Sequence, residues 1–133
     1  MAAGSISALY AGLAGLMLLF LSWRVTRFRR IDKVGIGDGG NKQLALAIRV
    51  QANFVEYAFP ILLLILVLEL NGFSAKKIHA LGMALIAARL LHALGLSQSG
   101  GYSFGRFWGT LLTWTVLGLA ALLAISAFFG FRI

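Results

Sequence analysis

The sequence predicts an all-α integral membrane protein that folds as a four-helix bundle. Its 133 residues are 60% hydrophobic and only 12% charged, about half the charged share of a soluble domain. The apolar residues fall into four runs, and glycine-rich or polar turns separate them. Four crossings and their short loops use up the chain, so residues 1–133 are expected to form one transmembrane domain.

The four expected spans cover about residues 5–23, 44–70, 77–96 and 106–129. Each has the roughly 20 residues that a helix needs to cross a hydrocarbon core about 30 Å thick. The segment 24–43 between the first two spans is expected to be a basic loop. Residues 71–76 make a short second connection, and residues 97–105 make the third.

The basic residues of this chain are unevenly distributed along it. The net charge is +8, and six of the twelve Lys and Arg residues lie in segment 24–43. Together with Arg106 they place seven basic residues on the side of loops one and three, so the positive-inside rule puts these loops in the cytoplasm. A juxtamembrane loop of this kind favours contact with anionic lipids. Nucleic acid is not expected as a partner, because no basic aromatic sheet or recognition helix accompanies the charge.

The chemistry of the site is restricted by the residues that are missing. There is no cysteine in the chain, which excludes disulfides, iron–sulfur clusters, thiolate metal sites and a cysteine nucleophile. His, Asp and Glu residues nowhere show metal-ligand spacing, so no metal is predicted.

The second span begins with a polar stripe. Arg49, Asn53, Glu56 and Pro60 recur at i, i+4, i+7 and i+11, which places them on one face of a helix. Ionisable residues inside a membrane segment usually mark a site or a substrate path, since they face protein or water and avoid lipid.

Charges from all four spans are expected at one depth. Counting about 20 residues back from Leu70 puts the cytoplasmic border of the second span near Val50. Glu56 lies seven residues from Arg49 at that border and Arg89 lies seven residues from Leu96, so both are about 10 Å deep at 1.5 Å per residue. Arg24 closes the first span at that end, and Arg106 opens the fourth. Several arginines against one deep carboxylate favour an anion, and one Glu adds a place for an ammonium group. A small peptide-like molecule with more than one carboxylate fits this set better than a phosphate.

Structural interpretations of the same residues stay open. Glu56 can pair with Arg89 or with Arg49 merely to fix the register of two helices. Arg24 and Arg106 can extend to the interface as snorkelling side chains. His92 is also interpreted as a packing residue, and Glu69 as interfacial and inert.

Several segments together resemble a known family. The pattern Arg49-x-Gln51-x-Asn53-x-x-Glu56-Tyr57 resembles the second-helix signature of the MAPEG family, the membrane-associated proteins of eicosanoid and glutathione metabolism. The segment 88–92, Ala-Arg-Leu-Leu-His, is similar to the third-helix motif. Gly105-Arg106, followed by Gly109-Thr110, is similar to the fourth-helix element of bacterial members.

The resemblance implies a homotrimer in the bacterial inner membrane that binds glutathione, as co-substrate, between neighbouring subunits at the cytoplasmic end. It assigns thiolate stabilisation to Arg106 and a place near the reacting groups to Arg24, with Arg27 as the alternative. The glutathione-binding positions carried over or inferred from depth are Arg49, Gln51, Asn53, Glu56, Tyr57, Arg89 and His92. Eicosanoid-forming members have tyrosine where this chain has Leu96, and often where it has His92, so those activities are not expected here.

The function that follows is a glutathione-dependent transferase or peroxidase that acts on lipophilic electrophiles or hydroperoxides. Two alternatives come from other classes. A small proton-coupled exporter of lipophilic cations would use Glu56 as its shared proton and cation site. A non-catalytic membrane assembly protein would need the arginines only for structure.

Overall fold

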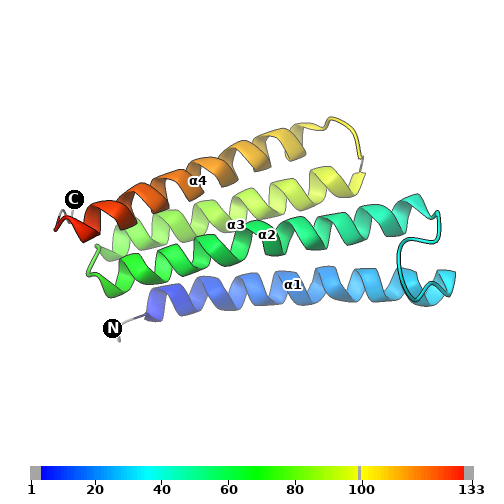
Figure 1. Ribbon diagram of the computed structural model, residues 1–133, viewed down its shortest axis with the longest axis horizontal. Helices are drawn as coiled ribbons and strands as arrows, with labels where there is room; N and C mark the ends of the chain where they lie inside the picture. Colours follow the sequence, from blue (N-terminus) through cyan, green and yellow to red (C-terminus); the bar gives the residue numbers. More distant parts are fainter. Residues whose placement is uncertain (1–3, 99, 131–133) are drawn as a thin grey trace.

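The protein is an antiparallel bundle of four long helices, as the sequence predicts. The computed structural model describes residues 4–98 and 100–130; residues 1–3, 99 and 131–133 lie outside the described part. The helices are α1 (Ser5–Asp32), α2 (Lys42–Leu70), α3 (Ala75–Gln98) and α4 (Phe104–Phe128). Figure 1 shows the α1–α2 and α3–α4 connections at one end of the bundle, and the α2–α3 connection at the other. The described residues contain no strand.

The packing order places α1 and α4 on opposite sides of the bundle. Helix α3 packs most extensively on α4, α1 packs on α2 and α3, and α2 touches each of the other three. Within the described ranges, no packing joins α1 to α4, and Figure 1 shows α2 and α3 between them. Residues on α1 and on α4 therefore reach the same level of the bundle without meeting in one chain.

The close contact between α3 and α4 depends on glycine. A Cβ atom added at Gly109 would lie 2.5 Å from the backbone nitrogen of His92, and one added at Gly95 would lie 2.2 Å from the backbone nitrogen of Arg106. Small residues let membrane helices approach closely enough for dispersion contacts to hold them. The third- and fourth-helix motifs are thus brought together by backbone contact.

Large apolar side chains line both the inside and the outside of the bundle. Ile61, Ile65, Ile78 and Leu85 are fully buried in the core. Many others are exposed, and all four helices are long and apolar enough to span a membrane. Such a surface needs a lipid solvent, so the chain is a multi-pass membrane protein.

The expected basic loop is shorter than residues 24–43. Helix α1 continues to Asp32, where Lys33 takes a left-handed conformation with φ of 54° and donates its N–H to the Arg29 carbonyl. Charge ends an apolar run but does not break a helix, and arginines are favourable in the last turn of a helix. The Asn41 side chain caps α2 by accepting from two backbone N–H groups. The connecting segment therefore comprises only residues 33–41.

Glu69 has a structural role that the sequence did not reveal. Its carboxylate, at the last turn of α2, accepts hydrogen bonds from the backbone nitrogens of Ile6 at 3.0 Å and Ser7 at 2.7 Å, and from the Ser7 hydroxyl. A negative charge at a helix N-terminus satisfies free N–H groups and complements the helix dipole. Sequence periodicity could not reveal this cap, because the two partners are more than sixty residues apart.

Candidate functional site

The deep carboxylate of the polar stripe pairs with Arg49. Arg49 Nη1 and Glu56 Oε1 are 3.2 Å apart, two turns apart on α2, and the two side chains are 61% and 48% exposed. This is the one ion pair found among residues 4–98 and 100–130. Arg89, the other partner considered for Glu56, makes different contacts. The pair presents one positive and one negative group on an open face of α2.

Arg89 lies inside the bundle and binds neutral acceptors. It is 1% exposed. Its Nη2 donates to Asn53 Oδ1 at 2.6 Å and to His92 Nδ1 at 3.1 Å, and its Nη1 donates to Thr113 Oγ1 at 3.2 Å. Because a guanidinium only donates, His92 must carry its proton on Nε2 in this contact. The Arg89 guanidinium carbon also lies 5.7 Å from the centre of the Tyr57 ring, within cation–π range.

These contacts make Arg89 a positioning residue for the helix-two signature. Arg89, on α3, contacts Asn53 and Tyr57 from the interior of the bundle. The same guanidinium is bound to Thr113 of α4, so α3 and α4 together hold it beside both residues. His92 is buried, and its backbone lies against Gly109. The structure therefore places His92 in the packing between α3 and α4.

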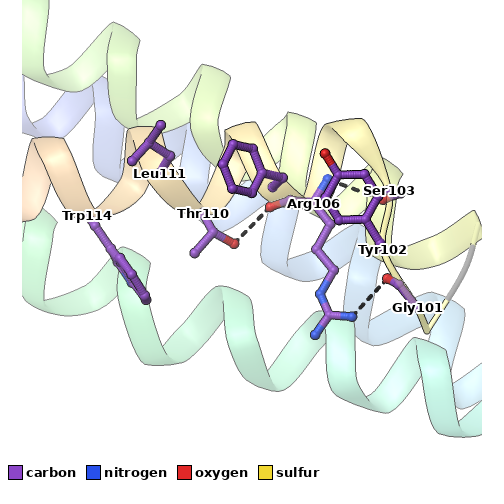
Figure 2. Close-up of a pocket in the computed structure, with 8 residues that line it drawn as sticks. Gly101, Tyr102, Ser103, Arg106, Thr110, Leu111 and Trp114 are labelled. Carbon is purple, nitrogen blue, oxygen red and sulfur yellow. Dashed lines mark hydrogen bonds between the residues drawn. The ribbon is translucent and has the colours of Figure 1, made fainter.

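Arg106 lines a cavity of about 440 Å³ beside α4. Its Nη1 donates to the carbonyl oxygens of Gly100 at 2.6 Å and Gly101 at 3.0 Å, in the α3–α4 connection. Figure 2 shows the Arg106 side chain extending away from α4, with Thr110, Leu111 and Trp114 following along the helix. Four of the eight lining residues have large aromatic or aliphatic side chains: Tyr102, Phe107, Leu111 and Trp114.

Trp114 links this cavity to α2. Its indole Nε1 donates to Tyr57 Oη at 3.3 Å. Tyr57 belongs to the helix-two signature, so the apolar wall of the cavity is joined to the helix that carries Arg49 and Glu56. Sequence reasoning missed Trp114, although a signal was present. The lining residues of α4 follow one helical stripe, at positions 106, 107, 110, 111 and 114.

Arg24 and Gln51 lie on other sides of the bundle. Arg24 Nη1 donates to Ser97 Oγ of α3 at 2.6 Å. Gln51 Nε2 donates to Ser22 Oγ of α1 at 2.9 Å. Since α1 and α4 do not touch in the described residues, Arg24 and Arg106 share a level without sharing a site in one chain. The sequence predicted a common depth for these arginines, and within one chain that depth does not bring Arg24 and Arg106 into one site.

The described residues form no metal centre. No group of three or more His, Cys, Asp or Glu residues there is arranged to hold an ion. The polar side chains that do cluster are guanidinium, amide, hydroxyl and a single carboxylate, a set suited to an organic zwitterion.

Comparisons with known proteins agree with the signature. The model of the MAPEG family matches residues 7–126. The inner membrane protein YecN of Escherichia coli strain K12 is 42% identical over 90 residues, which cover 68% of this chain and 69% of that protein. YecN of the Escherichia coli O6:H1 strain CFT073 matches with the same identity and coverage. The signature, the four apolar helices and these matches show that the chain belongs to the MAPEG family.

Proposed function

We propose that this protein binds glutathione at the α2–α4 face and activates its thiol for reaction with lipophilic electrophiles or hydroperoxides. One observation carries the proposal. Arg106 lines an apolar-walled cavity whose Trp114 is hydrogen-bonded to Tyr57, in the same helix segment as the open Arg49–Glu56 pair. Charged recognition groups and an apolar groove are thus adjacent, which suits a polar thiol and an apolar second substrate.

The residues present fit the tripeptide. Glutathione has two carboxylates and one ammonium group. Arg49 offers a guanidinium for a carboxylate, and Glu56 offers a carboxylate for the ammonium. Both side chains are about half exposed, so a ligand can reach them. Asn53 and Tyr57, held by Arg89, supply neutral polar contacts beside the pair.

The chemical role of Arg106 is to favour the thiolate. A free thiol is mostly protonated at neutral pH, and a guanidinium within hydrogen-bond reach stabilises the anion. Arg106 now holds two loop carbonyls, and these neutral acceptors are weaker partners than an anion. We therefore expect Arg106 to exchange them for the sulfur when glutathione binds.

The thiolate sulfur would then react in one of two ways. With an electrophilic carbon, the sulfur electron pair forms a C–S bond and the leaving group departs with its own pair. With a hydroperoxide, the sulfur takes the distal oxygen, the O–O bond breaks, and the alkoxide takes a proton to become an alcohol. A second glutathione then forms the disulfide and releases water. The residues of the cavity favour neither substrate over the other.

The proposal includes self-association, because one chain does not bring every signature residue to the α2–α4 face. Gln51 faces α1. On α1, the exposed small residues Ala8, Gly12 and Gly15 recur at i, i+4 and i+7, a stripe that favours close helix packing in membranes. A neighbouring copy docked on this side would add Gln51 and an α1 arginine to the site. Arg27 is exposed while Arg24 is bound to Ser97, which makes Arg27 the better candidate. The family resemblance implies that three copies assemble.

The test is a titration of the purified full-length protein with glutathione in detergent. We expect binding heat together with new ultraviolet absorbance from the thiolate. S-methylglutathione is the matched control, since it should give heat without the thiolate signal. Neither heat nor absorbance with glutathione would eliminate the enzyme proposal. Proton release on adding a lipophilic cation, abolished by Glu56→Gln, would instead support the exporter.

A further inference from the structure

A second cavity lies on the opposite side of the bundle from the α2–α4 face. It is a groove of about 320 Å³ between α1 and α3. Two of its lining residues, Arg24 and Ser97, are polar and lie at one end. The rest are apolar: Leu16, Met17, Phe20, Leu21, Leu90, Ala93 and Leu94. The groove is therefore amphipathic along its length, with a polar head and an apolar body.

A smaller cavity of about 230 Å³ adjoins the polar end. It is lined by Gln43, Phe28 and Leu46, and by the same Arg24 and Ser97 that end the groove. The two hollows share the Arg24–Ser97 hydrogen bond as a common wall. An arginine, an amide and a hydroxyl thus line a space next to the apolar groove.

No carboxylate among residues 4–98 and 100–130 forms an ion pair with Arg24. Its described partner is a hydroxyl, and the ion pair found in the described ranges lies on α2. An arginine bound only to a neutral acceptor keeps its preference for a phosphate or carboxylate. Arg27 follows one turn later on the same helix, so the local potential is positive.

The length of the groove corresponds to one leaflet. From Arg24 to Leu16 is eight residues of α1, or about 12 Å of helix rise, compared with about 15 Å for half a hydrocarbon core. The walls are large side chains, and Leu16, Phe20 and Leu94 are 66%, 59% and 62% exposed. Tight helix–helix interfaces in membranes favour small residues instead, which argues against a second copy of the chain as the occupant.

We propose that this groove is a specific site for an anionic phospholipid. The phosphate lies in the cavity formed by Arg24, Gln43 and Ser97, and one acyl chain follows the α1–α3 groove. The inference does not depend on glutathione binding, because the two sites use different helix faces. It assigns Arg24 to lipid recognition and leaves the α1 contribution to the catalytic site to Arg27.

The test measures lipid binding to the detergent-solubilised protein by native mass spectrometry. Phosphatidylglycerol and phosphatidylcholine with the same acyl chains are compared. We expect a preference for phosphatidylglycerol of at least about tenfold, as a charge-assisted contact gives. Arg24→Gln should abolish the preference. Arg30→Gln is the matched control, since it removes one charge from another face of the same helix and should leave the preference intact.

A groove-filling variant tests the acyl chain separately. Leu94→Trp adds bulk at an exposed wall position, so folding is not at risk. It should weaken the binding of long-chain phosphatidylglycerol about fivefold or more, while dihexanoyl phosphatidylglycerol binds as before. Equal binding of the two headgroups by the wild type, or equal losses in Arg24→Gln and Arg30→Gln, would overturn the proposal. A changed assembly mass in Leu94→Trp with unchanged lipid binding would also overturn it, by showing that a second copy fills the groove.

Discussion

The two ends of the bundle use polar residues differently. At the end that holds the α2–α3 connection, Glu69 caps α1, and the Tyr10 hydroxyl contacts His79 at both Nδ1 (2.9 Å) and the carbonyl oxygen (3.2 Å). Each of these groups finds its partner inside the same chain. At the opposite end, hydroxyl, amide, imidazole or carbonyl groups bind Arg24, Arg89 and Arg106, and in the part of the chain that the structure describes none of the three pairs with a carboxylate.

This difference distinguishes polar groups that stabilise the fold from polar groups that remain available to a ligand. A carboxylate that accepts three hydrogen bonds from a helix terminus is satisfied, so it fixes the fold and leaves nothing for a ligand. Guanidinium groups that bind neutral acceptors hold their geometry but keep an excess of positive potential. The charged end is therefore where anionic ligands are expected. Four predictions test the contrast, in order of decreasing effect.

The largest effect is expected from Arg106→Ala. Removing a guanidinium that stabilises a developing anion typically lowers turnover by roughly 100-fold or more. Thiolate absorbance should disappear, while the affinity for glutathione falls only a few-fold, because Arg49 and Glu56 remain. Arg106→Lys is the control that keeps the charge. Equal thiolate absorbance in Arg106→Ala and the wild type would show that another group activates the sulfur.

The second prediction concerns the shared site. Arg49→Ala and Gln51→Ala should each abolish glutathione binding on their own. If the two residues of one site come from neighbouring copies, co-expression of the two variants should restore about a quarter of the sites, since random mixing pairs one intact Arg49 with one intact Gln51 at that frequency. Calorimetry of the mixed assembly counts the sites. No restored binding would place both residues in one copy.

The third prediction tests the backbone contact beneath the charged end. Gly109→Ala would put a methyl group within 2.8 Å of the His92 backbone, which forces α3 and α4 apart and should cost about 1–3 kcal/mol of stability. Gly118→Ala is the matched control on the same helix, because nothing lies within 4 Å of its added Cβ. Thermal unfolding in detergent should rank Gly109→Ala well below both the wild type and Gly118→Ala. Equal melting temperatures for the two variants would refute close packing.

The smallest effect is expected at the opposite end. Glu69→Ala removes the cap of α1 and should lower the free energy of unfolding by about 1–2 kcal/mol. Glutathione binding should be unchanged, because Glu69 lies at the far end of α2 from Arg49. Glu69→Gln, which keeps an acceptor oxygen, should fall between Glu69→Ala and the wild type in thermal unfolding. A loss of glutathione affinity without a loss of stability would contradict the proposal that Glu69 stabilises the fold and takes no part in ligand binding.

The sequence by itself determined the elements and their chemistry. Four apolar runs of membrane length specify four helices, because a backbone in lipid must satisfy its own hydrogen bonds. The spacing of Arg49, Asn53 and Glu56 predicted a common helix face. The surplus of arginine predicts an anionic ligand, and that stays a prediction. Family membership followed from the same stripe, and the match to the MAPEG family confirmed it.

Only the tertiary structure decided which groups meet. It paired Glu56 with Arg49 instead of Arg89, turned Arg24 toward Ser97, and joined Trp114 to Tyr57. Helical periodicity gives the direction of a side chain on its own helix but not the rotation of one helix against another. That rotation is set by contacts such as Gly109 on His92, which bring together residues distant in the chain. The depth of each polar side chain along the bundle could therefore be inferred from the sequence, whereas the face of the bundle on which it lies could not.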